Sequence, residues 1–219
     1  VENAYRDVQI AFANEVALLC EALGGDAYEV RRLVNTCPFR DMHVPGSGVG
    51  GHCLPKDPWL LLSSAPDVNA KVIPSARAVN EGMPEHLADL AVRALKEHFG
   101  NGNRPKVAVM GLAFLRNSDD TRNSPAIPVI DRMMSLAEVV VHDRFVKERY
   151  FAPLVRDPYE AIKGADCAIF VTDHSEYQSL DLDRLRREMR TPILIDGRNI
   201  FNASDVRRKG FYYSAIGKG

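Results

Sequence analysis

The sequence predicts an α/β protein in which a helical domain is followed by a Rossmann-like domain built on a parallel sheet. Residues 2–23 contain no Pro or Gly, and apolar side chains recur there at the three- and four-residue steps of a helix. After residue 105 the pattern changes to short, continuous apolar runs with helical segments between them. Such runs are typical of parallel strands that helices cover on both faces.

The first hundred residues are expected to form three helices, over 2–23, about 28–35 and about 68–99, with an irregular stretch over 37–58. Pro74 and Pro84 mark a start and a kink within the third helix. A lone helix of that length buries little of its apolar face, so we expect a partner surface and a homodimer. The apolar positions concerned are Met83, Leu87, Leu90, Ala91, Ala94 and Leu95.

The second half is expected to hold the sheet. Residues 100–103 are rich in Gly and Asn and mark the boundary between a domain over 1–102 and a domain over 103–219. Ligands of such sheets bind beyond the carboxyl ends of the strands. The strands are expected at 106–111, 139–141, 168–171 and 193–195, and the helices at about 125–136, 158–163 and 182–189.

Composition excludes several classes of protein. The chain has 219 residues and a net charge of −1, which argues against broad attraction to nucleic acid or to an anionic membrane. No apolar run approaches the roughly 20 residues of a transmembrane helix. The four cysteines lack CxxC spacing, so we expect reduced thiols in a cytoplasmic protein. Position 1 is Val and no secretory pattern follows, so we expect a piece of a longer chain.

The most informative stretch is the glycine-rich loop, which we define as residues 45–52. With the residues that follow, it reads Pro-Gly-Ser-Gly-Val-Gly-Gly-His-Cys-Leu-Pro-Lys-Asp-Pro over 45–58. Its glycines predict a backbone that offers free N–H groups to phosphate or sugar oxygens. Cys53 follows with His52 and Lys56 nearby, as suits a nucleophilic thiol, and Asp57 could handle a proton. The alternative is a glycine turn followed by a buried structural cysteine.

A metal site is an alternative to this thiol chemistry. Cys37, His43, His52 and Cys53 could supply two sulfurs and two nitrogens to a zinc ion. Adjacent His-Cys ligands without a CxxC pair disfavour such a site, and no metal is expected.

Three further polar groups are candidates. Asn3, Arg6 and Asp7 share one helix face, which suits a polyhydroxylated, phosphorylated ligand or, alternatively, a solvated helix end with an internal ion pair. Arg122 could meet an anion or pair with Asp119 or Asp120. Arg198 follows the last expected strand and could be a ligand arm or a brace for its loop. The segment after residue 111 lacks the GxGxxG fingerprint.

The ordered motifs resemble the UDP-glucose/GDP-mannose dehydrogenase family. They are Glu-Asn-Ala-Tyr-Arg-Asp (2–7), Gly-Val-Gly-Gly-His-Cys-Leu-Pro-Lys-Asp (48–57), Ala-Arg-Ala-Val-Asn (76–80) with Met83-Pro84, Gly-Leu-Ala-Phe (111–114) with Asp-Thr-Arg (120–122), and Asp-Gly-Arg (196–198). The resemblance implies an NAD-binding domain, a central dimerisation domain and a nucleotide-sugar domain, of which this chain holds the second and third.

The resemblance also implies the reaction and its residues. The family oxidises the C6 alcohol of a nucleotide sugar twice, with NAD as cofactor and a cysteine that holds the aldehyde as a thiohemiacetal and then a thioester. Cys53 is implied as nucleophile, Asn3 as hydrogen-bond donor to the reacting oxygen, and Asp57 in proton and water chemistry. Lys56 and Arg122 are implied to face NAD. The implied substrate-binding residues are Asn3, Arg6, Arg40 (reaching a neighbouring subunit), Gly48, Gly50, Phe114, Leu115 and Arg198.

Two positions depart from the family pattern. The family's catalytic Lys would precede Val1, and Leu115 stands where the family usually has Lys. His52, directly before Cys53, resembles the pattern of the family branch that acts on 2-acetamido sugars. This resemblance implies UDP-N-acetylmannosamine as the substrate, with UDP-N-acetylglucosamine or UDP-glucose as alternatives. The rival functions are a non-catalytic UDP-sugar-binding dimerisation module and a thiol redox sensor at Cys53.

Overall fold

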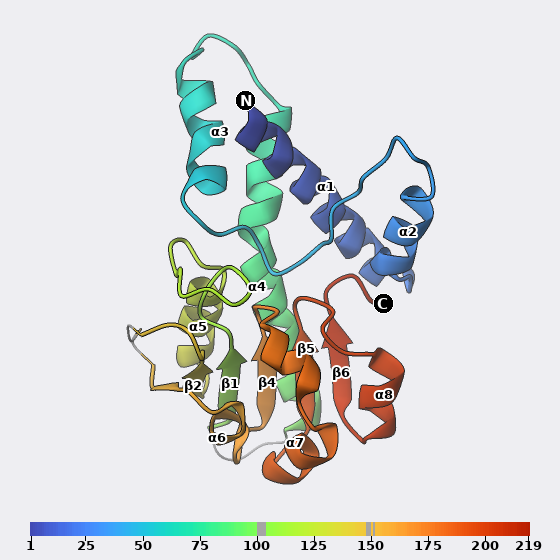
Figure 1. Ribbon diagram of the computed structural model, residues 1–219, viewed down its shortest axis with the longest axis vertical. Coiled ribbons are helices and arrows are strands. Elements are labelled where there is room, and N and C mark those ends of the chain that lie inside the picture. Colours follow the sequence, from blue (N-terminus) through green and yellow to red (C-terminus); the bar gives the residue numbers. More distant parts are fainter. Residues whose placement is uncertain (100–103, 148–149, 151) are drawn as a thin grey trace.

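The computed structural model describes residues 1–99, 104–147, 150 and 152–219, so the expected boundary at 100–103 lies outside the described residues. The helical part consists of α1 (Glu2–Leu23), α2 (Ala27–Val34), α3 (Cys53–Ser63) and the long α4 (Val72–His98). In Figure 1, α4 descends from this part and continues behind the sheet of the second half. The remaining elements in chain order are β1 (Lys106–Met110), α5 (Ala126–Met134), β2 (Glu138–His142), β3 (Leu154–Val155), α6 (Pro158–Ile162), β4 (Cys167–Phe170), the 3-10 helix η1 (Ser175–Ser179), α7 (Leu182–Glu188), β5 (Ile193–Asp196), α8 (Ala203–Arg208) and β6 (Tyr212–Ala215).

The described residues form one sheet of six parallel strands in the order β3-β2-β1-β4-β5-β6. This confirms the predicted α/β class with a parallel sheet. The chain leaves β1 towards β2 on one side and later returns to β4 on the other, so the strand order reverses between β1 and β4. In open parallel sheets, a crevice for ligands lies at this reversal, outside the carboxyl ends of the two strands.

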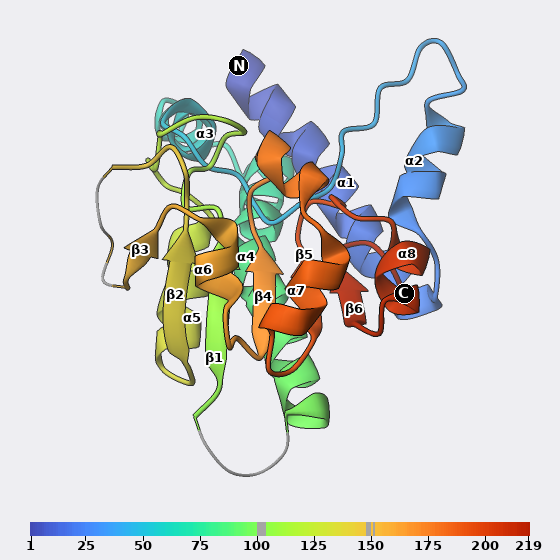
Figure 2. The same cartoon turned by 60° about the horizontal axis from the view of Figure 1, so that its bottom comes forward.

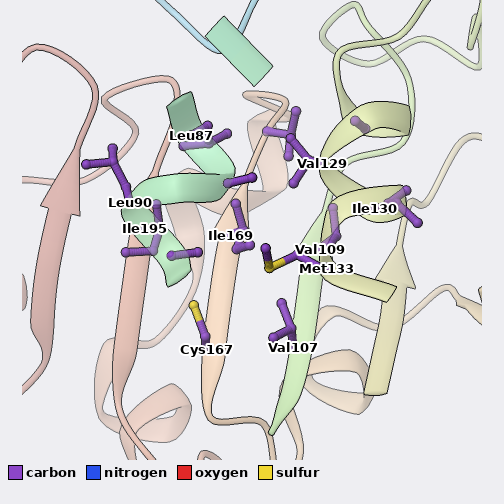
Figure 3. Packing of buried hydrophobic residues seen from close by; sticks show 14 of the residues in the cluster. Leu87, Leu90, Val107, Val109, Val129, Ile130, Met133, Cys167, Ile169 and Ile195 are labelled. Atoms are coloured by element: carbon purple, nitrogen blue, oxygen red, sulfur yellow. The ribbon is translucent and has the colours of Figure 1, made fainter. Parts of the chain in front are cut away.

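Alternate side chains of each strand face different helices. Val107 and Val109 of β1 and Ile169 of β4 pack with α4 and α5, whereas Met110 and Phe170 belong to a second cluster beneath α6, α7 and α8. Figure 3 shows the first cluster, and Figure 2 shows α6 and α7 in front of the strands. The continuous apolar runs of the sequence therefore arise because both faces of the sheet are covered.

The apolar side of α4 has a different partner from the one expected. Met83, Leu87, Leu90 and Ala94 are buried within this chain, in the same cluster as the inner strands. The argument for a homodimer from these positions was therefore wrong, because the protein's own sheet already covers them. The homodimer itself stays a prediction, and it needs a different surface.

The structure corrects the expected irregular stretch over 37–58. The helix α3 begins at Cys53 and contains two of the prolines, Pro55 and Pro58. Pro55 lies in the first turn, where backbone N–H groups have no partner within the helix, so only Pro58 removes an internal hydrogen bond. Four short elements were not predicted, namely β3, β6, η1 and α8.

Candidate functional site

The glycine-rich loop lies over the carboxyl end of β4. Ser47 Oγ donates to the carbonyl oxygen of Val171, one residue beyond β4, at 2.7 Å, and Ser47 is buried. Below it, β1 ends at Met110, and a Cβ added at the next residue, Gly111, would lie 2.5 Å from Thr172 Cβ. The loop thus covers the reversal point of the sheet, where the strand order predicts a ligand.

Both halves of the chain hold this loop in place. From the helical part, Asn14 Oδ1 accepts from the N–H of Gly46 at 2.9 Å. From the segment after β1, the carbonyl oxygen of Arg122 accepts from the N–H of Gly51, and Asn123 Nδ2 donates to the Gly51 carbonyl oxygen, both at 2.8 Å. The expectation of free N–H groups is therefore wrong at Gly46 and Gly51, since both bond internally.

Close packing explains two of the glycines. A Cβ at Gly50 would lie 2.4 Å from Phe114 Cβ and 3.0 Å from the Asn123 carbonyl oxygen. A Cβ at Gly46 would lie 2.6 Å from Nη1 of Arg198. The loop can therefore approach Phe114 and Arg198 only because these positions carry no side chain.

Cys53 is exposed and is the first residue of α3. The alternative of a buried structural cysteine is therefore wrong. The free N–H groups of the first helical turn favour a negative charge at this end of the helix. Asp57 follows one turn later on the same face, and Asn3 Nδ2 donates to Asp57 Oδ2 at 2.7 Å. The first turn of α1 lies beside α3 (Figure 1), so the structure brings a carboxylate and an amide together one turn from Cys53.

The three polar residues at the start of α1 make separate contacts. Asp7 is buried and accepts from Arg77 at 2.7 Å, so the alternative of an internal ion pair at a solvated helix end is wrong for Asp7. Burial raises the pKa of Asp7, although Arg77 and Asn80 act in the opposite direction. Arg6 instead lines a groove.

This substrate-sized groove, of about 530 Å³, lies between α1, the glycine-rich loop and the segment after β1. Six of the predicted substrate-binding residues line it: Arg6, Gly48, Gly50, Phe114, Leu115 and Arg198. Ile10, Arg31, Asp41, His43, Val44, Val49 and Leu54 complete the lining. Three arginines in one groove suit an anionic ligand such as a phosphate ester.

Arg198 is held at the groove by a carboxylate. Its Nη2 lies 3.7 Å from Oδ1 of Asp173, which also pairs with Arg116. Burial by itself would raise the pKa of Asp173, but the Arg198 and Arg116 guanidinium groups lower it below its usual value. Arg198 is therefore braced by Asp173 and also lines the groove, while its role as a ligand arm stays a prediction.

The predicted cofactor residues lie outside the groove. Arg122 is exposed and pairs with Asp120 at 2.6 Å, and the hydrogen bond to Asp120 and the charge of that carboxylate raise the pKa of Arg122. Lys56 is exposed on α3, one turn from Cys53. Arg40 is exposed on the loop after α2 and is not among the residues that line the groove of its own chain.

Sequence reasoning missed a buried carboxylate that shapes the segment carrying Phe114. Oδ2 of Asp143 accepts from the N–H groups of Leu112 and Ala113 at 2.8 and 2.9 Å and from His174 Nε2 at 3.0 Å. Burial would raise the pKa of Asp143, but the bonds from His174 and Ala113 hold it far below its usual value. The sequence showed only an Asp two residues after the expected strand at 139–141, which does not indicate these partners.

The described residues contain no group of three or more His, Cys, Asp or Glu side chains arranged to hold a metal ion. They also contain no helix long and apolar enough to cross a membrane.

Comparison with known proteins gives two matches to family models. The central-domain model of the UDP-glucose/GDP-mannose dehydrogenase family matches residues 1–82, and the UDP binding domain model of that family matches residues 108–203. The UDP-N-acetyl-D-mannosamine dehydrogenase of Pyrococcus horikoshii is 40% identical over 223 residues, covering 100% of this chain and 50% of that relative.

Solved structures agree with these matches. The structure of a UDP-D-ManNAc dehydrogenase from Pyrococcus horikoshii has a TM-score of 0.90 at 41% identity and covers 100% of this chain and 50% of that one. An NDP-N-acetyl-D-galactosaminuronic acid dehydrogenase from Methanosarcina mazei Go1 has a TM-score of 0.91 at 36% identity, covering 99% and 49%. The chain therefore spans about half the length of the relatives that it matches.

Proposed function

Because the chain belongs to the UDP-glucose/GDP-mannose dehydrogenase family, we propose that it binds a UDP-sugar and supplies the thiol for oxidation of the sugar's C6 alcohol to a carboxylate. The observation that carries this proposal is the exposed Cys53 in the first turn of α3, one turn before the Asp57 that bonds to Asn3, and next in the chain to a residue of the groove lined by three arginines. Leu54, next to Cys53 in the chain, is part of the groove lining.

The groove holds the UDP-sugar by its phosphates. Arg6 and Arg198 approach from opposite halves of the chain, and guanidinium groups pair with phosphate oxygens through two parallel hydrogen bonds. Gly48 and Gly50 let the ligand lie against the backbone, and Phe114 offers a flat apolar face. Leu115 replaces a cation that the family pattern has, so affinity depends more strongly on Arg6 and Arg198.

Cys53 captures the aldehyde produced by the first oxidation. Its sulfur forms a bond to C6 while the carbonyl π bond breaks, and the proton goes to the oxygen, which gives a thiohemiacetal. Asn3 donates a hydrogen bond to that oxygen, Asp57 relays the thiol's proton to it, and Asp57 accepts a proton from the water that later attacks the thioester. After the second oxidation, water cleaves the thioester, which releases the uronate and restores the thiol.

The cofactor of the family fits this chain only at its edge. Lys56 and Arg122 are exposed cations near Cys53, which suits contact with a pyrophosphate, while the segment after β1, where the dinucleotide fingerprint follows a strand, has no GxGxxG sequence. When bound, NAD⁺ supplies the hydride acceptor for both oxidations. Most of its binding surface therefore belongs to a domain other than the two matched here.

The proposed sugar is N-acetylmannosamine, which the name of the 40% identical relative carries. The N-acetylgalactosaminuronic acid relative makes another 2-acetamido sugar the second candidate. The proposed partner is a second copy of the chain. Phe12 and Val72 are exposed and line an apolar groove between α1 and α4, a surface that the chain's own sheet does not cover. Arg40 would then reach the neighbouring copy's site.

The proposal is tested on the 219-residue chain by cysteine alkylation. Iodoacetamide labelling of Cys53, read by peptide mass spectrometry, is expected to slow when a UDP-N-acetylhexosamine 6-aldehyde is added, because the thiohemiacetal occupies the sulfur. Cys37 is also exposed, and its labelling is expected to stay unchanged, which makes it the internal control. If the aldehyde changes the labelling rate of neither cysteine, the proposed chemistry is contradicted.

Calorimetric titration with UDP separates this proposal from the rival of a binding module without chemistry. Both predict binding of UDP, and only the enzyme predicts protection of Cys53 by the aldehyde. Absence of UDP binding contradicts both.

A further inference from the structure

A buried polar chain links α4 and α1 to the glycine-rich loop. It consists of Arg77, Asp7, Asn80 and Asn14, all of which are buried, and it ends at the N–H of Gly46. Arg77 and Asn80 belong to the Ala-Arg-Ala-Val-Asn motif, to which the proposed chemistry gives no role. Because none of the four side chains lines the groove, a direct contact with the ligand is not their role.

Each contact in the chain fixes the orientation of the next amide. Oδ1 of Asp7 accepts from Arg77 at 2.7 Å and from Nδ2 of Asn80 at 2.8 Å. Asn80 therefore turns Oδ1 towards Asn14 and accepts from its Nδ2 at 2.9 Å. Asn14 is left with Oδ1 facing the loop, where it accepts from Gly46. An amide has one acceptor end and one donor end, so the chain of bonds has a single direction.

The far end of the chain decides where Arg198 lies. Gly46 is so close to Arg198 that a Cβ there would lie 2.6 Å from Nη1 and 3.2 Å from Cδ. Movement of Gly46 towards the groove therefore displaces the guanidinium group, and movement away removes its support. At the near end, Asp7 lies one turn after Asn3, whose amide meets Asp57.

We infer that Asn14 is a positioning residue that sets the height of the glycine-rich loop and thereby places Arg198 for a UDP phosphate. The inference rests on the proposed function, since it takes UDP as the ligand of the groove. Asn14 acts through Gly46, so it affects ligand affinity and leaves the accessibility of the Cys53 thiol largely unchanged.

The test compares two substitutions of Asn14 that share one loss and differ in another. Asn14→Leu removes the acceptor for Gly46 and the donor to Asn80. Asn14→Asp keeps an oxygen for Gly46, loses the amide donor and places a second acceptor oxygen opposite Asn80 Oδ1. Asn14→Leu is expected to weaken UDP binding about tenfold or more by calorimetry, and Asn14→Asp less than about threefold. Iodoacetamide labelling of Cys53 is expected to change less than about twofold in both.

Asp181→Ala is the matched control for a loss of stability. Asp181 caps α7 by accepting from the N–H groups of Asp183 and Arg184, and its removal lowers the stability of the chain without touching the groove. Unchanged UDP affinity in folded Asn14→Leu overturns the inference. So does an equal loss in Asn14→Asp, because the loss would then follow stability and not the contact to the loop.

Gly46→Ala covers the case in which Asn14→Leu does not fold. The added methyl displaces Arg198 while all four buried side chains remain, so UDP binding is expected to fall as far as in Arg198→Ala. Wild-type affinity in Gly46→Ala overturns the inference. If the wild-type chain itself does not bind UDP, the proposed function fails first.

Discussion

At the scale of single residues, the site depends on side chains whose positions are fixed by the residues packed around them. Cys53 was predicted because a thiol between glycines, a lysine and a carboxylate is unusual, and the structure places it exposed at a helix start. Asn14 and Asp143 were missed because their importance comes from partners 32 and 31 residues away in sequence. No spacing rule connects residues across that separation, so only the folded chain reveals them.

One buried histidine makes stability depend on pH. His142 lies fully buried at the end of β2, with Nδ1 2.7 Å from the Tyr177 hydroxyl and Nε2 3.1 Å from the Arg156 carbonyl oxygen. Burial lowers the pKa of His142 from 6.5 to about 4. In the unfolded chain His142 binds a proton below pH 6.5, whereas in the folded chain it does so only below about pH 4. The free energy of unfolding therefore falls as the pH falls between these two values.

The size of this effect is measurable by urea unfolding. When the pH is lowered from 7.5 to 4.5, His142 alone is expected to reduce the free energy of unfolding by about 3 kcal/mol. His142→Gln, which cannot titrate, is expected to be less stable at neutral pH and to show a pH dependence weaker by that amount. A variant with the same slope as the wild type shows that other groups cause the dependence.

At the scale of elements, the sequence predicted those helices and strands that are long enough to show a periodic pattern of apolar residues. The helix over 2–23 has the observed bounds, and the strands at 106–111, 139–141, 168–171 and 193–195 correspond to β1, β2, β4 and β5. The start of α3 was missed because Pro55 and Pro58 argued against a helix, although a first turn tolerates proline. β3, with two residues, is too short for a period to show.

The glycine-rich loop gives a prediction at this scale. Gly50→Ala places a methyl 2.4 Å from Phe114 Cβ and 3.0 Å from the Asn123 carbonyl oxygen, so the loop must move away from the segment after β1. The free energy of unfolding is expected to fall by about 1–3 kcal/mol, and UDP affinity to fall with it.

Gly82→Ala is the control for that substitution. Gly82 lies in α4 with nothing within 4 Å of an added Cβ, so alanine is expected to raise the free energy of unfolding by about 0.5–1 kcal/mol. Urea titrations measure both variants. A Gly50→Ala protein as stable as the wild type, with unchanged UDP affinity, contradicts the account of the loop.

At the scale of the whole molecule, the two parts of the chain share one interior. The first hydrophobic cluster includes Ala17 of α1, Leu87 of α4 and Ile216 after β6, so helices from the first hundred residues complete the packing of the sheet. The apolar pattern of residues 68–99 could not reveal this, because a buried face looks the same whether the chain's own sheet or another chain covers it.

The surface that remains for a second copy leads to a prediction for the assembly. Phe12→Asp puts a charge on the apolar groove between α1 and α4 and is expected to convert the proposed dimer into a monomer, because a charge buried in that contact would lack a partner. Analytical ultracentrifugation measures the change. Leu23→Asp, at the exposed far end of α1, is expected to leave the assembly intact. A monomeric wild-type chain contradicts the proposal.

The length of α4 has a consequence for how this protein can change through evolution. Asn80 bonds to Asp7 of α1, and Leu87, two turns later, packs in the interior of the sheet domain. One residue inserted between them would rotate everything beyond it by about 100° and advance it by about 1.5 Å. Insertions and deletions should therefore be eliminated there and tolerated in the segment over 64–71, because this stretch of helix fixes the distance and rotation between the contacts with α1 and the interior of the sheet.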